Sequence, residues 1–206
     1  LYDIEGSDKM QILKMLTRLR QLCLEPRLVY DNIDQPSSKL KACMELIKTM
    51  QENKQKVLLF SSFTSALDLI AEECQKAGIT YYMLTGSTNK EERRELVSRF
   101  QKDDTTLFLI SLKAGGTGLN LTSAENVIHY DPWWNVSAQN QATDRAYRIG
   151  QKSNVQVFNL VMKDSVEEKI IEMQKRKKEL ADMFVENNSG GLSQMSKEDI
   201  LSLFTM

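Results

Sequence analysis

Two arginines, Arg145 and Arg148, have the residue type and the spacing to bind an anion. They stand in the segment QATDRAYRIGQ (141–151), which opens with Gln141. Residues three apart on a helix share a face, so both guanidinium groups would point the same way. Such groups are always charged and form paired hydrogen bonds to phosphate oxygens. The segment therefore indicates a phosphate contact or an arginine finger, and an ion pair between Asp144 and Arg148 is the structural alternative.

These arginines need a scaffold, and the upstream sequence predicts an α/β fold. Short apolar runs typical of buried strands occur at 56–60, 79–84, 106–110, 126–130 and 155–161. Helical patterns separate several of them, at 64–77 and from 88 to about 100. Strands that alternate with helices of this length predict βαβ units and a mainly parallel sheet.

Helices are also expected outside this α/β region. Their patterns cover 8–24, about 39–50, 165–185 and 196–204. The expected caps are Ser37 or Ser38, a glycine cap at Gly78, and capping boxes Thr88–Glu91 and Ser165–Glu168. The last long helix is expected to turn a stripe inward that includes Val166, Ile170, Met173, Leu180 and Phe184. We divide the chain into an N-terminal helical segment (1–36), an α/β lobe (37–164), a C-terminal helix (165–185) and a linker with a short terminal helix (186–206).

Four loops of unusual composition follow the expected strands. They are SSFTS after 60, TGST after 84, SLKAGGTG after 110 and DPWWN after 130. Ligands of parallel sheets collect beyond the carboxyl ends of the strands, so we expect a binding edge there. The sequence contains no G-x-x-x-x-G-K-[ST] loop and no strand that ends in a D-E pair. The chain therefore lacks the usual parts for holding ATP and a metal ion by itself.

The aromatic loop and its flanks allow two interpretations each. One of Trp133 and Trp134 belongs in the core, and the other is free to stack on a base or a partner lobe. His129 is either a hydrogen-bonded structural residue or, less in keeping with its neighbours, a catalyst. The basic run KRKK (175–178) is either a solvated face or a contact to a nucleic-acid backbone.

Composition sets the broad class. Lys and Arg number 27 against 28 acidic residues in 206, which argues against a broad basic surface but allows a local strip. The scattered Cys23, Cys43 and Cys74 are expected to be reduced thiols, and no metal ligands are predicted. No apolar run is long enough to cross a membrane. The first residue is Leu1, so we expect a piece of a longer protein.

The motifs together resemble those of a known family. Two consecutive motifs are similar to the second motor lobe of the Swi/Snf-like ATPases, among the superfamily-two helicases. They are SLKAGGTGLNLTSAENVIHYDPWWN and, after it, QATDRAYRIGQ. Four more stretches extend the resemblance over about residues 10–185. They are VLLFSSFTSALDLI, YYMLTGSTNKEERRELVSRF, LRQLCLEP and SSKLKACMELI. It implies a RecA-like three-layer lobe with helical N- and C-terminal extensions. Val136 stands where the family often has proline, so a less rigid loop is expected there. LCLEP lacks the N-H-P of nuclear members, and this difference favours a bacterial protein.

The resemblance also implies an activity and a site. The activity is DNA-stimulated ATP hydrolysis that drives movement along double-stranded DNA, with ATP and Mg²⁺ held mainly by a first lobe that we do not find here. This chain alone would be inactive. Arg145 and Arg148 match arginine fingers, and Gln141, Gly116 and Gly118 match nucleotide-side positions. The DNA-side positions match Ser61, Thr85, Gly86, Ser111 and Lys113, with Trp133 at a position that couples hydrolysis to movement.

Two other functions are compatible with an α/β fold. A non-catalytic DNA- or protein-binding module built on such a lobe is the main alternative, although it would not need the arginine pair. A dinucleotide-dependent enzyme is disfavoured because no G-x-G-x-x-G follows the first strand. The expected partners are double-stranded DNA and the first lobe, without a membrane. The expected location is the bacterial cytoplasm with the nucleoid, or the nucleus of a eukaryote.

Overall fold

The computed structural model describes most of the chain. The described residues are 6–115, 121–133, 139–140, 143 and 155–186, with the backbone alone for 6–9, 115 and 180–186. Within them a five-stranded sheet has the order β2-β3-β1-β4-β5, and every neighbouring pair is parallel. The strands are β1 (Val57–Ser61), β2 (Tyr81–Leu84), β3 (Leu107–Ser111), β4 (Asn126–His129) and β5 (Gln156–Asn159).

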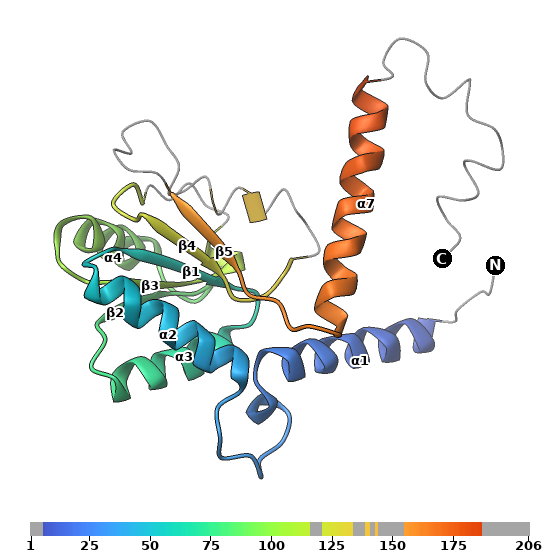
Figure 1. Cartoon of the computed structure of the whole chain (residues 1–206), viewed down its shortest axis with the longest axis horizontal. Coiled ribbons are helices and arrows are strands. Elements are labelled where there is room, and N and C mark those ends of the chain that lie inside the picture. The colour runs from blue at the N-terminus through green and yellow to red at the C-terminus, as the bar shows by residue number, and fades with distance from the viewer. Residues whose placement is uncertain (1–5, 116–120, 134–138, 141–142, 144–154, 187–206) are drawn as a thin grey trace.

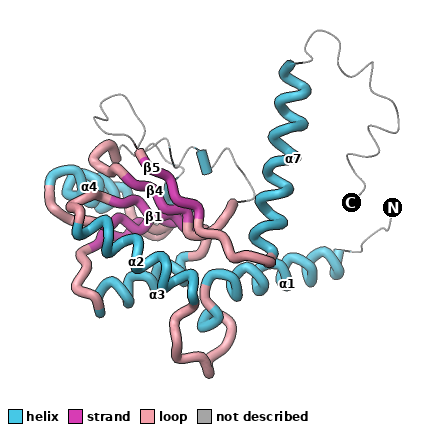
Figure 2. The backbone as a smooth tube through the Cα atoms, viewed as in Figure 1, coloured by secondary structure: helices cyan, strands magenta, loops and turns pink. Residues whose placement is uncertain are grey.

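Helices cover both faces of this sheet, which makes three layers (Figure 1). Alternate strand residues point to opposite faces, so β1 sends Val57 and Leu59 to one side and Leu58 and Phe60 to the other. The first side packs against α2 (Ser38–Glu52) and α3 (Thr64–Lys76). The second packs against α4 (Lys90–Lys102) and α5 (Leu112–Gly115). The expected mainly parallel α/β lobe is confirmed (Figure 2).

Two long helices flank the carboxyl ends of the strands. Helix α1 (Gly6–Leu24) precedes a short 3₁₀ helix, η1 (Pro26–Leu28), and α7 (Val166–Glu186) follows β5. The first turns of α7 lie against α1, and the rest of α7 extends away from the sheet (Figure 1). The two helical extensions therefore meet each other beside the lobe.

Local signals placed the helix ends with two corrections. Ser37 caps α2 by accepting a hydrogen bond from Leu40 N at 3.1 Å, and Gly78 has the left-handed φ of +67° expected of a glycine cap. The cap of α4 is Asn89 rather than Thr88, because the side-chain Oδ1 of Asn89 accepts hydrogen bonds from the backbone N–H groups of Glu91 and Glu92. The Ser165–Glu168 box is also altered, since Glu168 accepts from Asp164 N.

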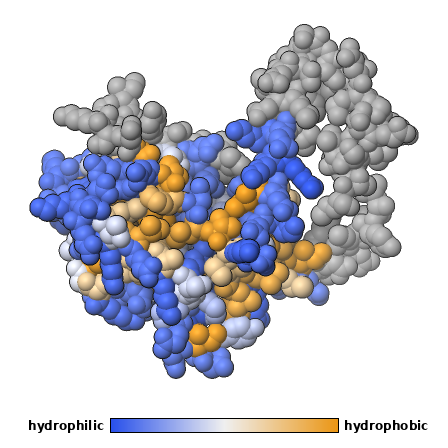
Figure 3. Space-filling model, in the orientation of Figure 1, coloured by the Kyte–Doolittle hydropathy of each residue, from blue (hydrophilic) through white to orange (hydrophobic). Residues whose placement is uncertain are grey.

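The apolar stripes of the two flanking helices are less buried than their periodicity predicts. In α7, Ile170 is buried, but Met173 is 45% exposed and so departs from the expected inward stripe. In α1, several apolar side chains are exposed: Met10, Ile12, Leu13, Met15 and Leu19. Figure 3 shows apolar surface on the right of the molecule, where α1 lies. Among the described residues no helix is long and apolar enough to cross a membrane.

Candidate nucleic-acid and nucleotide interface

The loops after β2 and β3 place polar groups at the surface, beside each other. Leu84 pairs with Ile110, so Thr85 and Lys113 follow neighbouring strands at the same edge. Lys113 and Gly86 are exposed, and nothing lies within 4 Å of a Cβ built on Gly86. The Thr85 hydroxyl lies 2.7 Å from the Ser87 hydroxyl in the same loop. This edge offers an ammonium, hydroxyls and open backbone, which are groups that bind phosphate oxygens.

Two other residues predicted at this surface are buried. Ser61 is 0% exposed and its hydroxyl donates to Asp131 Oδ1 at 2.8 Å. Ser111 is 3% exposed, and its hydroxyl has no hydrogen-bond partner in the described part of the chain. Both are the last residues of strands that pack between helices on both faces, which explains their burial. The structure thus places these hydroxyls beneath the surface rather than facing a DNA backbone.

Asp131, which follows β4, joins three segments at the carboxyl edge. Besides the Ser61 hydroxyl, it accepts hydrogen bonds from Ser62 N at 3.0 Å and from the Ser62 hydroxyl. Arg20 of α1 forms an ion pair with it at 2.9 Å, and both side chains are nearly buried. The Arg20 guanidinium also lies 4.9 Å from the centre of the Phe63 ring. The Asp131 carboxylate is therefore fully engaged in holding α1 and the β1–α3 loop together.

His129 and Trp133 form an aromatic cluster with Phe60 under the same edge. The Phe60 and His129 rings stack at 5.8 Å, and Trp133 meets both edge-on. Trp133 is 3% exposed, so its ring packs in the core instead of lying open to a DNA base. Its backbone carbonyl accepts a hydrogen bond from Gln174 of α7. Trp133 can thus influence the surface loops only through the residues that it contacts.

The His129 side chain is a buried, neutral, hydrogen-bonded residue. It is 1% exposed, and burial lowers its pKa from 6.5 to about 4. Its Nε2 lies 3.0 Å from the Thr143 hydroxyl. This arrangement agrees with the structural interpretation of His129 rather than with a catalytic one.

The predicted nucleotide-side residues lie outside the described residues. They are Gly116, Gly118, Gln141, Arg145 and Arg148. Three described residues show where that part of the chain is attached: Gln139, Asn140 and Thr143 have helical backbone. The Gln139 amide donates to Asn159 of β5 at 3.0 Å, and Thr143 contacts His129 of β4. The start of the arginine segment is therefore anchored on β4 and β5.

A buried ion pair joins α2 to α7. Lys39 Nζ lies 2.6 and 2.7 Å from the two carboxylate oxygens of Glu167, and both side chains are at most 2% exposed. Glu167 also accepts from Met162 N at 2.8 Å, and Lys39 Nζ lies 5.4 Å from the centre of the Tyr130 ring. The Tyr130 hydroxyl donates to the carbonyl of Leu24, at the end of α1. One cluster thus fixes the ends of both helical extensions to the lobe.

Sequence reasoning did not identify Arg20, Asp131, Lys39 or Glu167. The members of each pair are 111 and 128 residues apart, so no local spacing indicates that they meet. Asp131 had one available signal, as an acid directly after a buried strand. The sequence predicts no metal site. Among the described residues no cluster of three or more His, Cys, Asp or Glu side chains could hold a metal ion.

The family model for the helicase conserved C-terminal domain matches residues 38–150, more than half of the chain. The chain belongs to this family. Helicase C-terminal lobes of known structure are similar to it. It matches the Sulfolobus solfataricus SWI2/SNF2 ATPase C-terminal domain with a TM-score of 0.70 and 29% identity, covering 85% of this chain and 75% of that one. It matches the ATPase core domain of the same organism with a TM-score of 0.73 and 32% identity, covering 98% of this chain and 42% of that one.

Curated relatives place this helicase C-terminal lobe in the Swi/Snf-like group. A putative ATP-dependent helicase/translocase of Bacillus subtilis is 38% identical over 96% of the chain. A mouse SWI/SNF-related, matrix-associated, actin-dependent regulator of chromatin (subfamily A member 1) is 35% identical over 95% of it. The chain spans 22% and 20% of the length of these two proteins. The lobe is a RecA-like Swi/Snf ATPase lobe, as the sequence motifs predict.

Proposed function

We propose that this chain is the second motor lobe of an ATP-dependent double-stranded DNA translocase. Its fold and family support this, and the surface after β2 and β3 is the observation that carries it. That surface joins an exposed ammonium to open backbone and hydroxyls on one edge of a parallel sheet. In this function the lobe works with a first RecA-like lobe, and α7 braces the pair.

The DNA contact in this proposal is to the phosphate backbone. Lys113, Thr85 and Gly86 meet phosphate oxygens, which positions the protein without reading sequence. Ser61, Ser111 and Trp133 act from beneath, because each is at most 3% exposed. They keep the shape of the loops that reach the DNA. The place of action in this proposal is the bacterial cytoplasm, or the nucleus of a eukaryote.

The nucleotide contact in this proposal is shared between lobes. ATP and Mg²⁺ are held mainly by the first lobe. Arg145 and Arg148 act as arginine fingers, with Gln141 and the glycines Gly116 and Gly118 beside the nucleotide. An arginine finger is worth roughly 10³–10⁵ in turnover. The isolated chain accordingly has no ATPase activity of its own.

The decisive experiment is DNA-stimulated ATPase of the complete polypeptide that contains this chain and a first lobe. We expect Arg148→Ala to lower turnover by about 10³ or more. Arg99→Ala is the matched control, because Arg99 is 59% exposed and pairs with Glu95 on the surface of α4. Turnover in Arg148→Ala equal to that of Arg99→Ala would rule out the finger.

The DNA surface has its own test. Lys113→Ala should weaken binding to duplexes of every sequence alike and should reduce the slope of log K against log salt by about one. Lys76→Ala is the control, since Lys76 is exposed at the end of α3, at the opposite edge of the sheet, and pairs with Glu73. Equal salt slopes for the two variants would remove Lys113 from the interface.

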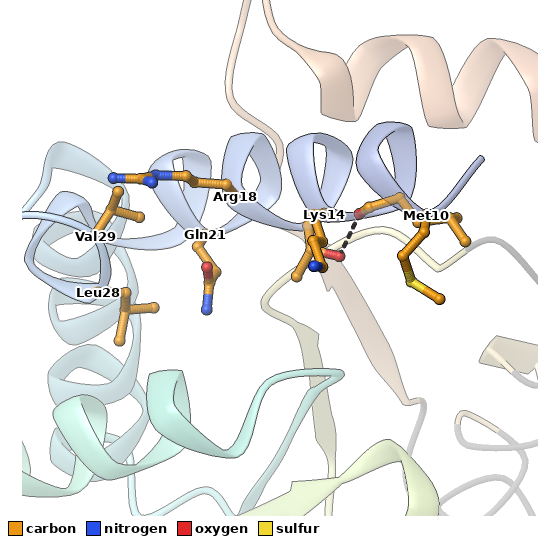
Figure 4. A pocket seen from close by; sticks show the side chains of 8 residues that line it. Met10, Lys14, Arg18, Gln21, Leu28 and Val29 are labelled. Carbon is orange, nitrogen blue, oxygen red and sulfur yellow. Dashed lines mark hydrogen bonds between the residues drawn. The ribbon is translucent and has the colours of Figure 1, made fainter. Parts of the chain in front are cut away.

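One observation favours the alternative of a protein-binding module. Met10 and Leu13, two of the exposed apolar side chains of α1, border a hollow of about 600 Å³ beside the segment that follows α1 (Figure 4). Its lining joins apolar Met10 and Leu28 to basic Lys14 and Arg18. A pure binding module would keep its DNA affinity and show no ATPase loss with Arg148→Ala in the complete polypeptide.

A further inference from the structure

The hydrogen bond between His129 and Thr143 joins the core of the lobe to the segment that carries the arginines. Thr143 stands two residues before Arg145 and five before Arg148. Its hydroxyl lies 3.0 Å from His129 Nε2 and 3.3 Å from the carbonyl oxygen of Gln139. A carbonyl only accepts, so the hydroxyl proton goes to Gln139. His129 Nε2 must then donate its proton to the hydroxyl oxygen of Thr143.

The His129 ring is held so that this donor points in one direction. Phe60 stacks on the ring at 5.8 Å with an interplanar angle of 26°, and Trp133 meets it edge-on at 5.7 Å. The side chain is 1% exposed, and its Nδ1 has no hydrogen-bond partner in the described part of the chain. The Thr143 hydroxyl is therefore the polar contact that the ring makes within this part. The aromatic packing leaves Nε2 facing a fixed point.

We propose that His129 is a positioning residue, which orients the start of the arginine segment through Thr143. Two residues span at most about 7 Å, so Arg145 stays within that distance of Thr143. A displacement of Thr143 is therefore passed on to Arg145. Gln139 supports the same turn by donating to Asn159. The inference rests on the proposed role of the arginines. It assigns to His129 and Thr143 a part in turnover that needs no contact with the nucleotide.

The first test compares Thr143→Val with Thr143→Ser in the ATPase assay of the complete polypeptide. Valine removes the hydroxyl at similar volume, and serine keeps it. We expect Thr143→Val to lower kcat about five- to tenfold, the effect of losing one neutral hydrogen bond. The KM for ATP should change less than about twofold, because the proposal places ATP on the other lobe. Thr143→Ser should restore kcat to within about twofold.

The matched control is Thr49→Val. The Thr49 hydroxyl makes the same bond to the carbonyl four residues earlier, at 2.9 Å from Glu45 O, but it lies on the exposed side of α2. The kcat of Thr49→Val should equal that of the unchanged protein. Urea unfolding of each variant separates a positioning effect from a loss of fold. Thr143→Val with a fivefold lower kcat and an unchanged unfolding midpoint supports the inference.

The second test uses the single histidine of the chain as a spectroscopic probe. In the 206-residue chain, ¹⁵N-resolved spectra of His129 should show the neutral ring protonated at Nε2, and Thr143→Val should shift the Nε2–H resonance. A ring protonated at Nδ1 would overturn the assignment of His129 as the donor, and no shift in Thr143→Val would overturn the hydrogen bond itself.

The outcomes separate this inference from the proposed function. A large loss with Arg148→Ala and none with Thr143→Val would overturn the positioning role and leave the arginine finger standing. No loss with Arg148→Ala would overturn the finger, and the positioning role with it, whatever the spectra of His129 show.

Discussion

The buried His129 ring makes the stability of this chain depend on pH in a defined window. Its pKa is about 4 in the folded chain, against 6.5 for an exposed histidine, because burial disfavours the charged ring. Between these values the unfolded chain binds a proton that the folded chain does not. Stability is therefore greatest above pH 6.5 and falls as the pH drops toward 4. At about 1.4 kcal/mol per pKa unit, the full loss is about 3 kcal/mol.

The assay is urea unfolding of the 206-residue chain at a series of pH values from 7.5 to 5. At pH 5 most carboxylates are still ionised in both states, so the histidine dominates the change. We expect the free energy of unfolding to fall by about 2 kcal/mol over this range. The comparison is His129→Gln, which has no titrating ring and should show a nearly flat profile. If the two proteins lost stability in parallel, the buried neutral histidine could not be the cause.

Three further predictions concern stability and thiol chemistry. Lys39→Met leaves a buried carboxylate without its partner and should lower the free energy of unfolding in urea by about 3–5 kcal/mol. Adding Glu167→Met should recover most of this loss. An unaffected single variant would contradict the buried pair. Asn89→Ala should cost about 1 kcal/mol through the lost cap of α4, and no change would return the cap to another residue. Burial raises the pKa of Cys43, and that of Cys74 to about 12, so both thiols should resist labelling at pH 8 until the chain unfolds. Mass-spectrometric detection of label on either thiol before unfolding would contradict this burial.

The central strands could be predicted because burial on both faces leaves a local signal. Residues 57–60 are apolar without interruption, and all are 0% exposed between two layers of helices. Gly78 was equally predictable, because a left-handed φ at a helix end favours glycine. The helices at the lobe's edge were harder. Ile12 and Leu19 repeat with helical period, yet both stay more than 40% exposed, since periodicity shows a face but not what covers it.

The site was predicted as a set of loops but not as a set of contacts. Thr85, Gly86 and Lys113 follow strands, so their common edge follows from the parallel sheet alone. The hydrogen bond of the Ser61 hydroxyl could not be deduced, because its acceptor, Asp131, lies seventy residues later in the chain. Hydrogen bonds between distant segments leave no periodic trace in a sequence. The residues that organise this edge are for that reason the ones that only the folded structure identifies.

The Lys39–Glu167 pair has a consequence for where this unit can be cut. The family match ends at residue 150, and a fragment trimmed to that boundary would strand a buried ammonium group with no counter-charge. A fragment that begins at residue 38 would also lose Leu24, which packs in one core cluster with residues of α2, and the buried Glu25, which accepts a hydrogen bond from Ser37 N. A fragment that keeps these contacts therefore runs from the end of α1 through the first turns of α7. On the carboxyl side, the end of the family match and the end of the packed unit differ by about twenty residues.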